Sequence, residues 1–247
     1  MNGETSLRQN YDTVLGRIAS SCVRAQRPPG SVSLLAVSKT FPAHKVLELA
    51  RLGQRAFGEN YLQEALEKIS ACRAERPDSG LEWHFIGPIQ SNKTRPIAES
   101  FHWVHSIERE KTARRLAEQR PAGLPPLNVC IQANVSGEAS KSGCAPEAAL
   151  PLARLVATLP GLKLRGVMAI PEPTGDAAIL AAQFGAAQQV FESLERAGLP
   201  VDTLSMGMSA DLDAAIAHGT TMVRIGTALF GARAAATAGS ARPASGP

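Results

Sequence analysis

Aromatic residues are scarce in this chain of 247 residues, of which Phe, Tyr and Trp make up only 4%. Proteins that bind single-stranded nucleic acids stack bases on aromatic side chains, and this chain offers few of them. It also lacks an apolar run of the roughly 20 residues that a membrane-spanning helix needs. The opening residues, MNGETSLRQNYDT, do not combine a basic segment with an apolar run, as a secretory signal does. We therefore expect a cytoplasmic protein that does not associate with a membrane.

Cysteine is sparse as well, and the four cysteines lie far apart in the sequence, at Cys22, Cys72, Cys130 and Cys144. No two of them form a CxxC pair, and only five histidines are available as further ligands. Structural zinc sites need ligands at close and regular spacing. The cysteines therefore predict reduced thiols, with neither a disulfide framework nor a metal site.

The excess of positive charge is small, with a net charge of +4 and a pI of about 9.0. Residues 1–120 carry 18 basic and 13 acidic side chains, so the first half is mildly basic. Its densest basic cluster, at residues 109–120, is interleaved with Glu108, Glu110 and Glu118. Mixed charge of this kind is typical of a solvated helix face. We therefore expect no specific binding of DNA or RNA.

Short apolar segments alternate along the chain with segments of helical periodicity. After a leading helix at 4–26, we expect eight strands, at residues 32–38, 55–59, 82–86, 101–105, 127–133, 162–169, 202–205 and 221–225. Between the strands we expect helices, at residues 42–53, 61–73, 92–100, 108–119, 146–158, around 180–194 and up to residue 218. Turn residues such as Pro42 and Gly53 mark the ends of these segments.

Eight strand–helix units in about 230 residues, without a long insertion, predict an α/β fold of the (β/α)8 or TIM-barrel type. We expect a single domain at residues 1–233 that starts with the N-terminal helix. A tail rich in Ala, Gly, Ser and Pro, at residues 234–247, is expected to be flexible. A doubly wound open sheet is the alternative, but no GxGxxG motif follows the first strand.

Lys39 stands out because it follows the apolar run Leu34–Val37 at the end of the first predicted strand. Active sites of such barrels lie at the C-terminal ends of the strands. A lysine at the barrel mouth is partly desolvated, which lowers the pKa of its amine and makes the amine a nucleophile toward carbonyl groups. An ordinary solvated lysine is the alternative, but the position favours a lysine that forms a Schiff base.

A second group of residues follows the seventh and eighth strands, where (β/α)8 barrels often bind phosphate. The segment Arg224–Thr227 closes the eighth strand, and the segment Ser205–Ser209 follows the seventh. Gly226 permits close approach of the backbone, and N–H groups at a helix start together with the Thr227 hydroxyl suit a phosphate group. With Lys39, these segments predict a site for an aldehyde that carries a phosphate.

Further polar residues fall on or after the predicted strands. Asn60 follows the second strand and His105 ends the fourth. His84 lies on the third strand and is either a packed core histidine or a ligand contact. The segment 136–143 is polar and rich in glycine, which is typical of a surface loop or of a mobile lid. Met206 and the other methionines are expected around the barrel mouth or in the core.

Six stretches of the sequence form a recognisable series: AVSKT (36–40), FGENYLQE (57–64), WHFIGPIQSNK (83–93), QANVSGEASKSG (132–143), GVMAIP (166–171) and LSMGMSADLDAAIAHGTTMVRIGTALFGAR (204–233). In this order the stretches resemble the pyridoxal-phosphate (PLP) homeostasis proteins, also known as the proline synthetase co-transcribed family. The resemblance covers nearly the whole chain, from about Tyr11 to Arg233. No single stretch is specific, whereas the ordered series is.

The resemblance implies a fold and a cofactor. The family is similar to the barrel domain of bacterial alanine racemases and has no second domain. By this resemblance, Lys39 forms the internal aldimine with PLP, and Arg224 faces the pyridine nitrogen. Ser209, Gly226 and Thr227 are implied to hold the phosphate of the cofactor.

Three further residues, Asn60, His84 and Met206, are implied to line the ring of the cofactor. The resemblance implies a protein that stores or delivers PLP and keeps the vitamin B6 vitamers in balance, without catalytic turnover. It also suggests transient contacts with PLP-dependent apo-enzymes. We expect a monomer or a weak dimer.

A PLP-dependent amino-acid racemase is the alternative function. Racemisation needs proton delivery on both faces of the α-carbon, and in the racemases the lysine serves one face while a tyrosine associated with their second domain serves the other. This chain has only Tyr11, in the leading helix, and Tyr61, next to Asn60. The missing second acid–base group therefore favours binding without turnover.

Overall fold

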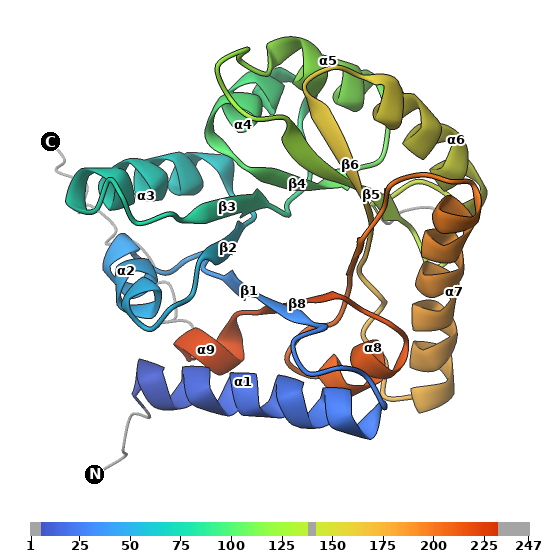
Figure 1. Cartoon of the computed structure of the whole chain (residues 1–247), viewed down its shortest axis with the longest axis horizontal. Coiled ribbons are helices and arrows are strands. Elements are labelled where there is room, and N and C mark those ends of the chain that lie inside the picture. The colour runs from blue at the N-terminus through green and yellow to red at the C-terminus, as the bar shows by residue number, and fades with distance from the viewer. Residues whose placement is uncertain (1–5, 138–141, 232–247) are drawn as a thin grey trace, which may run out of the picture.

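In the computed structural model, which describes residues 6–137 and 142–231, eight parallel strands close into a barrel (Figure 1). The strands are β1 (Ser33–Val37), β2 (Ala56–Glu59), β3 (Glu82–Phe85), β4 (Trp103–Ile107), β5 (Leu127–Ala133), β6 (Leu162–Ala169), β7 (Thr203–Ser205) and β8 (Met222–Ile225). Each strand pairs with the next, and β8 pairs with β1. The predicted (β/α)8 barrel is confirmed. The expected domain boundary at residue 233 and the tail at 234–247 lie outside the described residues.

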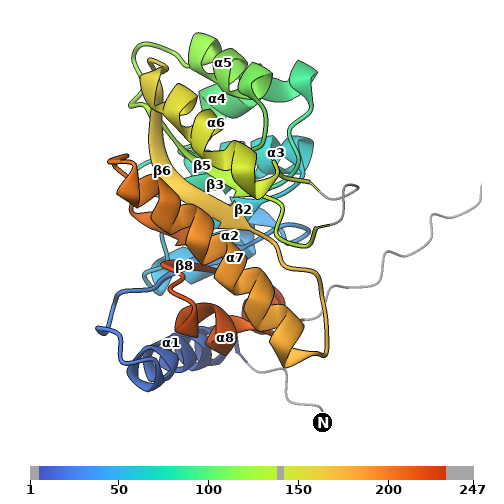
Figure 2. The same cartoon turned by 90° about the vertical axis from the view of Figure 1, so that its right-hand side faces the viewer.

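Helices surround the ring of strands on its outer side (Figure 1). They are α1 (Leu7–Arg24), α2 (Ala43–Arg51), α3 (Leu62–Glu75), the 3-10 helix η1 (Ser91–Lys93), α4 (Thr94–Ser100), α5 (Glu110–Gln119), α6 (Pro146–Thr158), α7 (Ala177–Arg196), α8 (Leu212–Ala217) and α9 (Thr227–Phe230). Figure 2 shows α6 and α7 on the outer side of β5 and β6; α6 contacts both strands, and α7 contacts β6. Across the described ranges, the helices are too short or too polar to cross a bilayer.

The register of the strands sorts their side chains into two sets, because residues paired across parallel strands face the same side of the sheet. One set points into the barrel, and it includes Leu35, His84, Cys130, Met168, Ser205 and Arg224. The other set packs under the helices in the main hydrophobic core, and it includes Phe57, Phe85, Val104, Ile131, Val167, Leu204 and Val223. The interior of the barrel is therefore filled, and it is unusually polar.

The fourth strand starts and ends two residues later than the sequence predicts. Residues 101–105 were expected, whereas β4 runs from Trp103 to Ile107. Phe101 instead caps the C-terminal end of α4, and its backbone N–H donates to the carbonyl of Ile97. His105 consequently lies inside the strand and is completely buried, and it does not end the strand at the barrel mouth.

A glycine is required where β6 pairs with β7. Gly166 has a φ of +145°, and a Cβ built there would lie 2.0 Å from the carbonyl oxygen of Thr203. Side chains other than hydrogen are excluded at this distance. The same residue follows the register shift between Val129 and Cys130 of β5, so it marks an irregularity of the barrel wall.

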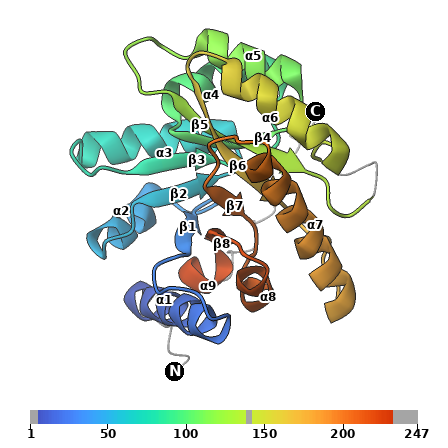
Figure 3. The same cartoon turned by 45° about the vertical axis from the view of Figure 1, so that its right-hand side comes forward.

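The N-terminal helix α1 packs against the last helices of the barrel. It contacts α8 and α9, as the turned view in Figure 3 shows. Its buried face carries Leu7, Tyr11, Val14 and Ile18, at the spacing of a helix that packs on one side. The side chain of Asn10 donates to the carbonyl of Leu229 at 2.9 Å and so joins α1 to α9.

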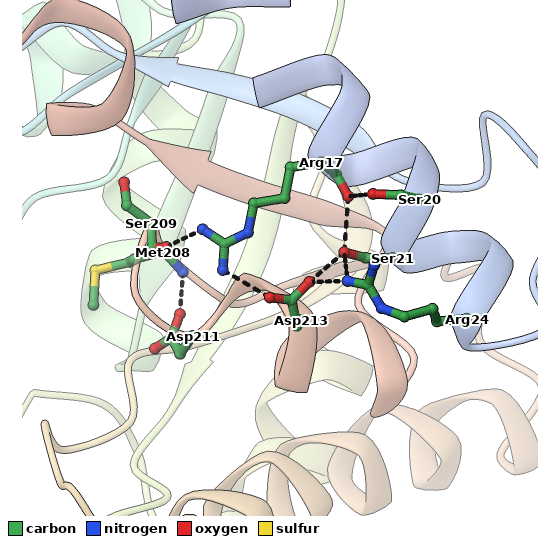
Figure 4. A network of polar contacts seen from close by, with 8 residues as sticks. All are labelled: Arg17, Ser20, Ser21, Arg24, Met208, Ser209, Asp211 and Asp213. Carbon is green, nitrogen blue, oxygen red and sulfur yellow. Dashed lines mark hydrogen bonds and ion pairs between the residues drawn. The ribbon is translucent and has the colours of Figure 1, made fainter. Parts of the chain in front are cut away.

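A polar network joins α1 to the loop between β7 and α8 (Figure 4). The guanidinium of Arg17 donates to the carbonyl of Ser209 at 2.7 Å and to the carboxylate of Asp213 at 2.8 Å. Asp213 also accepts from the hydroxyl of Ser21 and from Arg24. The hydrogen bonds from Ser21 and Arg17, together with the positive charges of Arg17 and Arg24, lower the pKa of the Asp213 carboxyl. Arg17 is thus the side chain of the network that reaches the loop itself.

Replacing Arg17 by Ala should loosen the loop at residues 206–211 without unfolding α1. The lost hydrogen bond is partly exposed, so we expect a cost of about 1 kcal/mol, or roughly fivefold faster local opening. Hydrogen–deuterium exchange of the loop amides measures this opening. Arg24→Ala is the matched control, because Arg24 pairs with the same Asp213 but does not touch the loop. Equal exchange in the two variants would contradict the assignment.

Candidate functional site

A cavity of about 320 Å³ opens at the C-terminal ends of the strands, where (β/α)8 barrels carry their sites. Six of the eight residues that the sequence points to line this cavity: Lys39, Asn60, Ser209, Arg224, Gly226 and Thr227. They come from segments that are up to 188 residues apart in the chain and that meet because β8 pairs with β1. The remaining two, His84 and Met206, are not among the residues that line it.

His84 and Met206 miss the cavity for different reasons. His84 points into the barrel, but Ile86, two residues further along, is the one that reaches the mouth. Met206 is completely buried in the main core, whereas Met208 is 37% exposed and lines the cavity. In both cases the residue two positions further along the chain lines the cavity instead, and residue type in a sequence motif does not distinguish the two.

The other six lining residues are all apolar, and they are Val37, Phe41, Ile86, Ile170, Met208 and Ala210. The ring of Phe41 stacks on that of Phe230, with centroids 4.8 Å apart. The segment that follows β1 therefore contacts α9 at this wall of the cavity. Ile170 is 45% exposed and belongs to the rim of the cavity. Cavity walls of this composition are usual for sites that bind small organic ligands.

Arg224 is the most buried of the charged residues at the cavity, with 4% of the residue exposed. One terminal nitrogen donates to the carbonyl and the hydroxyl of Ser205, at 2.6 and 3.0 Å. The other donates to the carbonyl of Ala169 at 2.8 Å. Burial lowers the pKa of Arg224 to about 10, so the guanidinium remains charged at neutral pH. Its orientation is therefore fixed by the ends of β6 and β7.

The segment that carries Lys39 is held from the opposite side of the strand. Thr40 has a φ of +68°, which is uncommon for a β-branched residue, and its N–H donates to Glu64 at 2.6 Å. The carbonyl of Ser38 accepts from the amine of Lys68 at 2.7 Å. Both neighbours of Lys39 are thus anchored to α3, while Lys39 itself lines the cavity.

Lys68 and Glu59 form the centre of this anchor as a buried ion pair. Their side chains are 4% and 0% exposed, and the amine lies 2.6 Å from one carboxylate oxygen. The same oxygen accepts from the hydroxyl of Ser38 at 2.6 Å. Burial raises the pKa of the Glu59 carboxyl, while Lys68 opposes that shift by favouring the charged form. Glu59 ends β2, and Lys68 is recognisable as its partner only once the fold brings α3 onto β2.

Two hydroxyls and a glycine form the side of the cavity next to α9. Ser209 and Thr227 both line it, and Thr227 is the first residue of α9. A Cβ built on Gly226 would lie 3.1 Å from the carbonyl of Val37, so β8 and β1 approach closely there. None of the described residues that line the cavity is acidic. With Lys39 and Arg224 these donors suit an anionic ligand.

The glycine-rich segment at 136–143 does not contribute to the lining of the cavity through its described residues. The Asn134 side chain accepts from Ser136, and the N–H of Gly143 donates to Glu108 at 2.8 Å. Residues 138–141 lie outside the described part. Within that part, no group of His, Cys, Asp and Glu is arranged to hold a metal ion.

Replacing Lys68 by Met should destabilise the protein strongly, because it leaves the Glu59 carboxylate buried without its cation. Losing one partner of a buried pair costs about 3–5 kcal/mol. Urea unfolding measures the loss, and the double variant Glu59→Gln/Lys68→Met should recover much of it. Lys45→Met is the control, since the exposed pair with Glu48 contributes about 0.5 kcal/mol. Similar small losses in both single variants would contradict this role.

Comparison with known proteins identifies the family of the chain. Residues 15–234 match the family model "Alanine racemase, N-terminal domain". A protein of Pseudomonas aeruginosa named "Pyridoxal phosphate homeostasis protein" is 61% identical over 229 residues, covering 93% of this chain and 96% of the relative. One of Escherichia coli with the same name is 51% identical over 230 residues, covering 92% and 97%.

Solved structures agree with the fold. PipY of Synechococcus elongatus, solved with PLP bound, is 36% identical with a TM-score of 0.73, covering 87% of this chain and all of that one. Alanine racemase of Corynebacterium glutamicum has a TM-score of 0.64 at 18% identity, covering 92% of this chain and 63% of the racemase, which shows the shared fold alone. The resemblance predicted from the sequence is confirmed: the chain belongs to the alanine racemase N-terminal domain family and, within it, to the pyridoxal phosphate homeostasis proteins.

Proposed function

We propose that this chain binds PLP in the barrel cavity and serves the homeostasis of the cofactor, storing or delivering it without turning over an amino acid. The observation that carries the proposal is one cavity in which a primary amine, a guanidinium and two hydroxyls converge between apolar walls. The names of the relatives and the PLP-bound neighbour support the same ligand. Storage requires only a reversible bond to the aldehyde and a site for the phosphate.

The residues fit the chemistry of PLP. The amine of Lys39 can bond to the aldehyde, and Ser209, Gly226 and Thr227 suit the phosphate. Arg224 suits the ring nitrogen, because a guanidinium donates hydrogen bonds and accepts none. Bound PLP supplies an electrophilic carbonyl and an electron-withdrawing ring.

The remaining contacts divide between cavity and core. We place Asn60 beside the ring, and Ile86 and Met208 among the apolar walls, because all three line the cavity. His84 and Met206, which the sequence assigned to the ring side, lie elsewhere, and we assign them no direct contact.

The lining residues favour a protein without racemase activity. Lys39 is the only described lining residue whose side chain commonly serves as a general base. Tyr11 is buried in α1, where its hydroxyl donates to Gln54, and Tyr61 precedes α3 with 53% of the residue exposed. Neither tyrosine lines the cavity. Arg224 would donate a hydrogen bond to the ring nitrogen without transferring its proton to it. An unprotonated ring withdraws electrons less strongly, so a carbanion at the amino-acid α-carbon would be stabilised less.

Four further expectations belong to this proposal. We place the protein in the cytoplasm, since all four cysteines are free thiols. Its partners would be PLP, other B6 vitamers and, transiently, PLP-dependent apo-enzymes. We propose a monomer or weak dimer that binds no specific nucleic acid. The barrel domain would extend to residue 233 and be followed by a flexible tail.

Lys39→Ala should abolish the visible absorbance of the PLP complex and the covalent adduct trapped by borohydride, because no amine remains to bond the aldehyde. Mass spectrometry of the trapped wild-type protein should place the adduct on Lys39. Lys45→Ala is the control, since Lys45 is exposed and pairs with Glu48, and it should retain both signals. An equal yield of adduct on another lysine in Lys39→Ala would refute the assignment.

The PLP-loaded protein should racemise neither L- nor D-amino acids above background. Losing one positioned acid–base group costs about 10²–10⁴-fold in rate. Circular dichroism or chiral chromatography with each amino acid measures racemisation, with Lys39→Ala defining the background. A substantial rate in the wild type that disappears in Lys39→Ala would favour the racemase alternative.

A further inference from the structure

A chain of buried polar side chains crosses the interior of the barrel below the cavity. Arg224 donates to the hydroxyl of Ser205 at 3.0 Å, and that hydroxyl lies 3.1 Å from Nδ1 of His105. Nε2 of His105 lies 2.9 Å from Nδ1 of His84. Nε2 of His84 lies 3.8 Å from a carboxylate oxygen of Glu82, at the opposite end of β3 from the cavity. Four strands, β3, β4, β7 and β8, thus contribute to one chain.

The direction of the hydrogen bonds follows from Arg224. A guanidinium can only donate, so the hydroxyl of Ser205 must accept from it. Among the contacts of the described residues, Nδ1 of His105 is the other partner of that hydroxyl, so the hydroxyl proton points to His105. A neutral His105 that accepts on Nδ1 carries its proton on Nε2 and donates it to His84.

The far end of the chain gives the same direction independently. The atom of His84 that faces Glu82 is Nε2. A neutral His84 with its proton on Nε2 accepts on Nδ1, the atom that faces His105. Nε2 of His84 is buried and has no hydrogen-bond partner among the described residues. An N–H directed at the Glu82 carboxylate is attractive, whereas a lone pair there would be repelled. Both ends therefore require the Nε2–H form of both histidines.

The surroundings keep both rings uncharged. Both histidines are completely surrounded by protein, and burial lowers the pKa of each. Arg224 and His84 lower the pKa of His105 further, and Arg165 and His102 act in the same direction on His84, opposed by Glu82.

Aromatic packing also restricts one of the rings. The ring of Trp103 stacks on that of His84 at 5.0 Å, with the planes 8° apart. Rotation of the His84 ring is therefore hindered, which preserves the order of the chain.

We propose that Ser205, His105 and His84 are positioning residues that orient the Arg224 guanidinium at the cavity through a one-way chain of hydrogen bonds ending at Glu82. A charged histidine would reverse one link and place a second cation beside Arg224. The role of the chain toward PLP rests on the proposed function, whereas the direction of its hydrogen bonds does not.

Long-range ¹H–¹⁵N spectra of the ligand-free protein test the direction, because they distinguish the two neutral forms of histidine. The protein has five histidines, and single substitutions assign the signals of each. At neutral pH we expect His84 and His105 in the Nε2–H form. His102 is the internal control, since its Nδ1 accepts from the backbone N–H of Trp83 at 3.0 Å. An Nδ1–H or charged form of His84 or His105 would overturn the proposal.

PLP affinity tests whether the chain acts through Arg224. We expect His105→Leu and the milder Ser205→Ala to weaken PLP binding about tenfold, and His102→Leu to leave it unchanged. In an Arg224→Met background, Ser205→Ala should cause no further loss, whereas a merely structural role would cause the same loss in both backgrounds and overturn the proposal. Failure of the wild type to bind PLP would refute the proposed function alone, since the spectra still decide the direction of the chain.

Discussion

Side chains on a strand alternate between its two faces, and in a closed barrel one face is an interior that cannot be rearranged. This constraint sets the site. Val37 and Lys39 belong to the cavity, while Ser38 between them turns outward to the buried pair of Glu59 and Lys68. The end of β1 therefore presents the Lys39 amine to the cavity, while Ser38 holds it to Lys68 and Glu59 on the outer side of the barrel.

The two buried ionic groups near the cavity are stabilised in different ways. Lys68 is compensated by the carboxylates of Glu59 and Glu64, so its charge is balanced locally. Arg224 donates to two carbonyls and a hydroxyl, and among the described residues it has no ion-pair partner. Burying an uncompensated charge is costly, and an anion in the cavity would offset part of that cost.

Much of the architecture was accessible from sequence because periodicity and turn residues report local preferences. The eight strands and the order of the helices were predicted, and six site residues could be brought together by the rule for strand ends. The shift of β4 and the separation of Met206 from Met208 were not, since both depend on tertiary register. The partnership of Lys68 with Glu59 likewise depends on how α3 packs against β2.

The cavity lies across the closure of the barrel, where the first strand pairs with the last. Lys39 follows β1 and Thr227 follows β8, so the two halves of the site come from the first and the last strand of the barrel. During synthesis, the site is incomplete until the eighth strand has left the ribosome. A ligand held by both segments joins the first strand to the last, and it stabilises the closed ring by an amount that grows with its concentration relative to Kd.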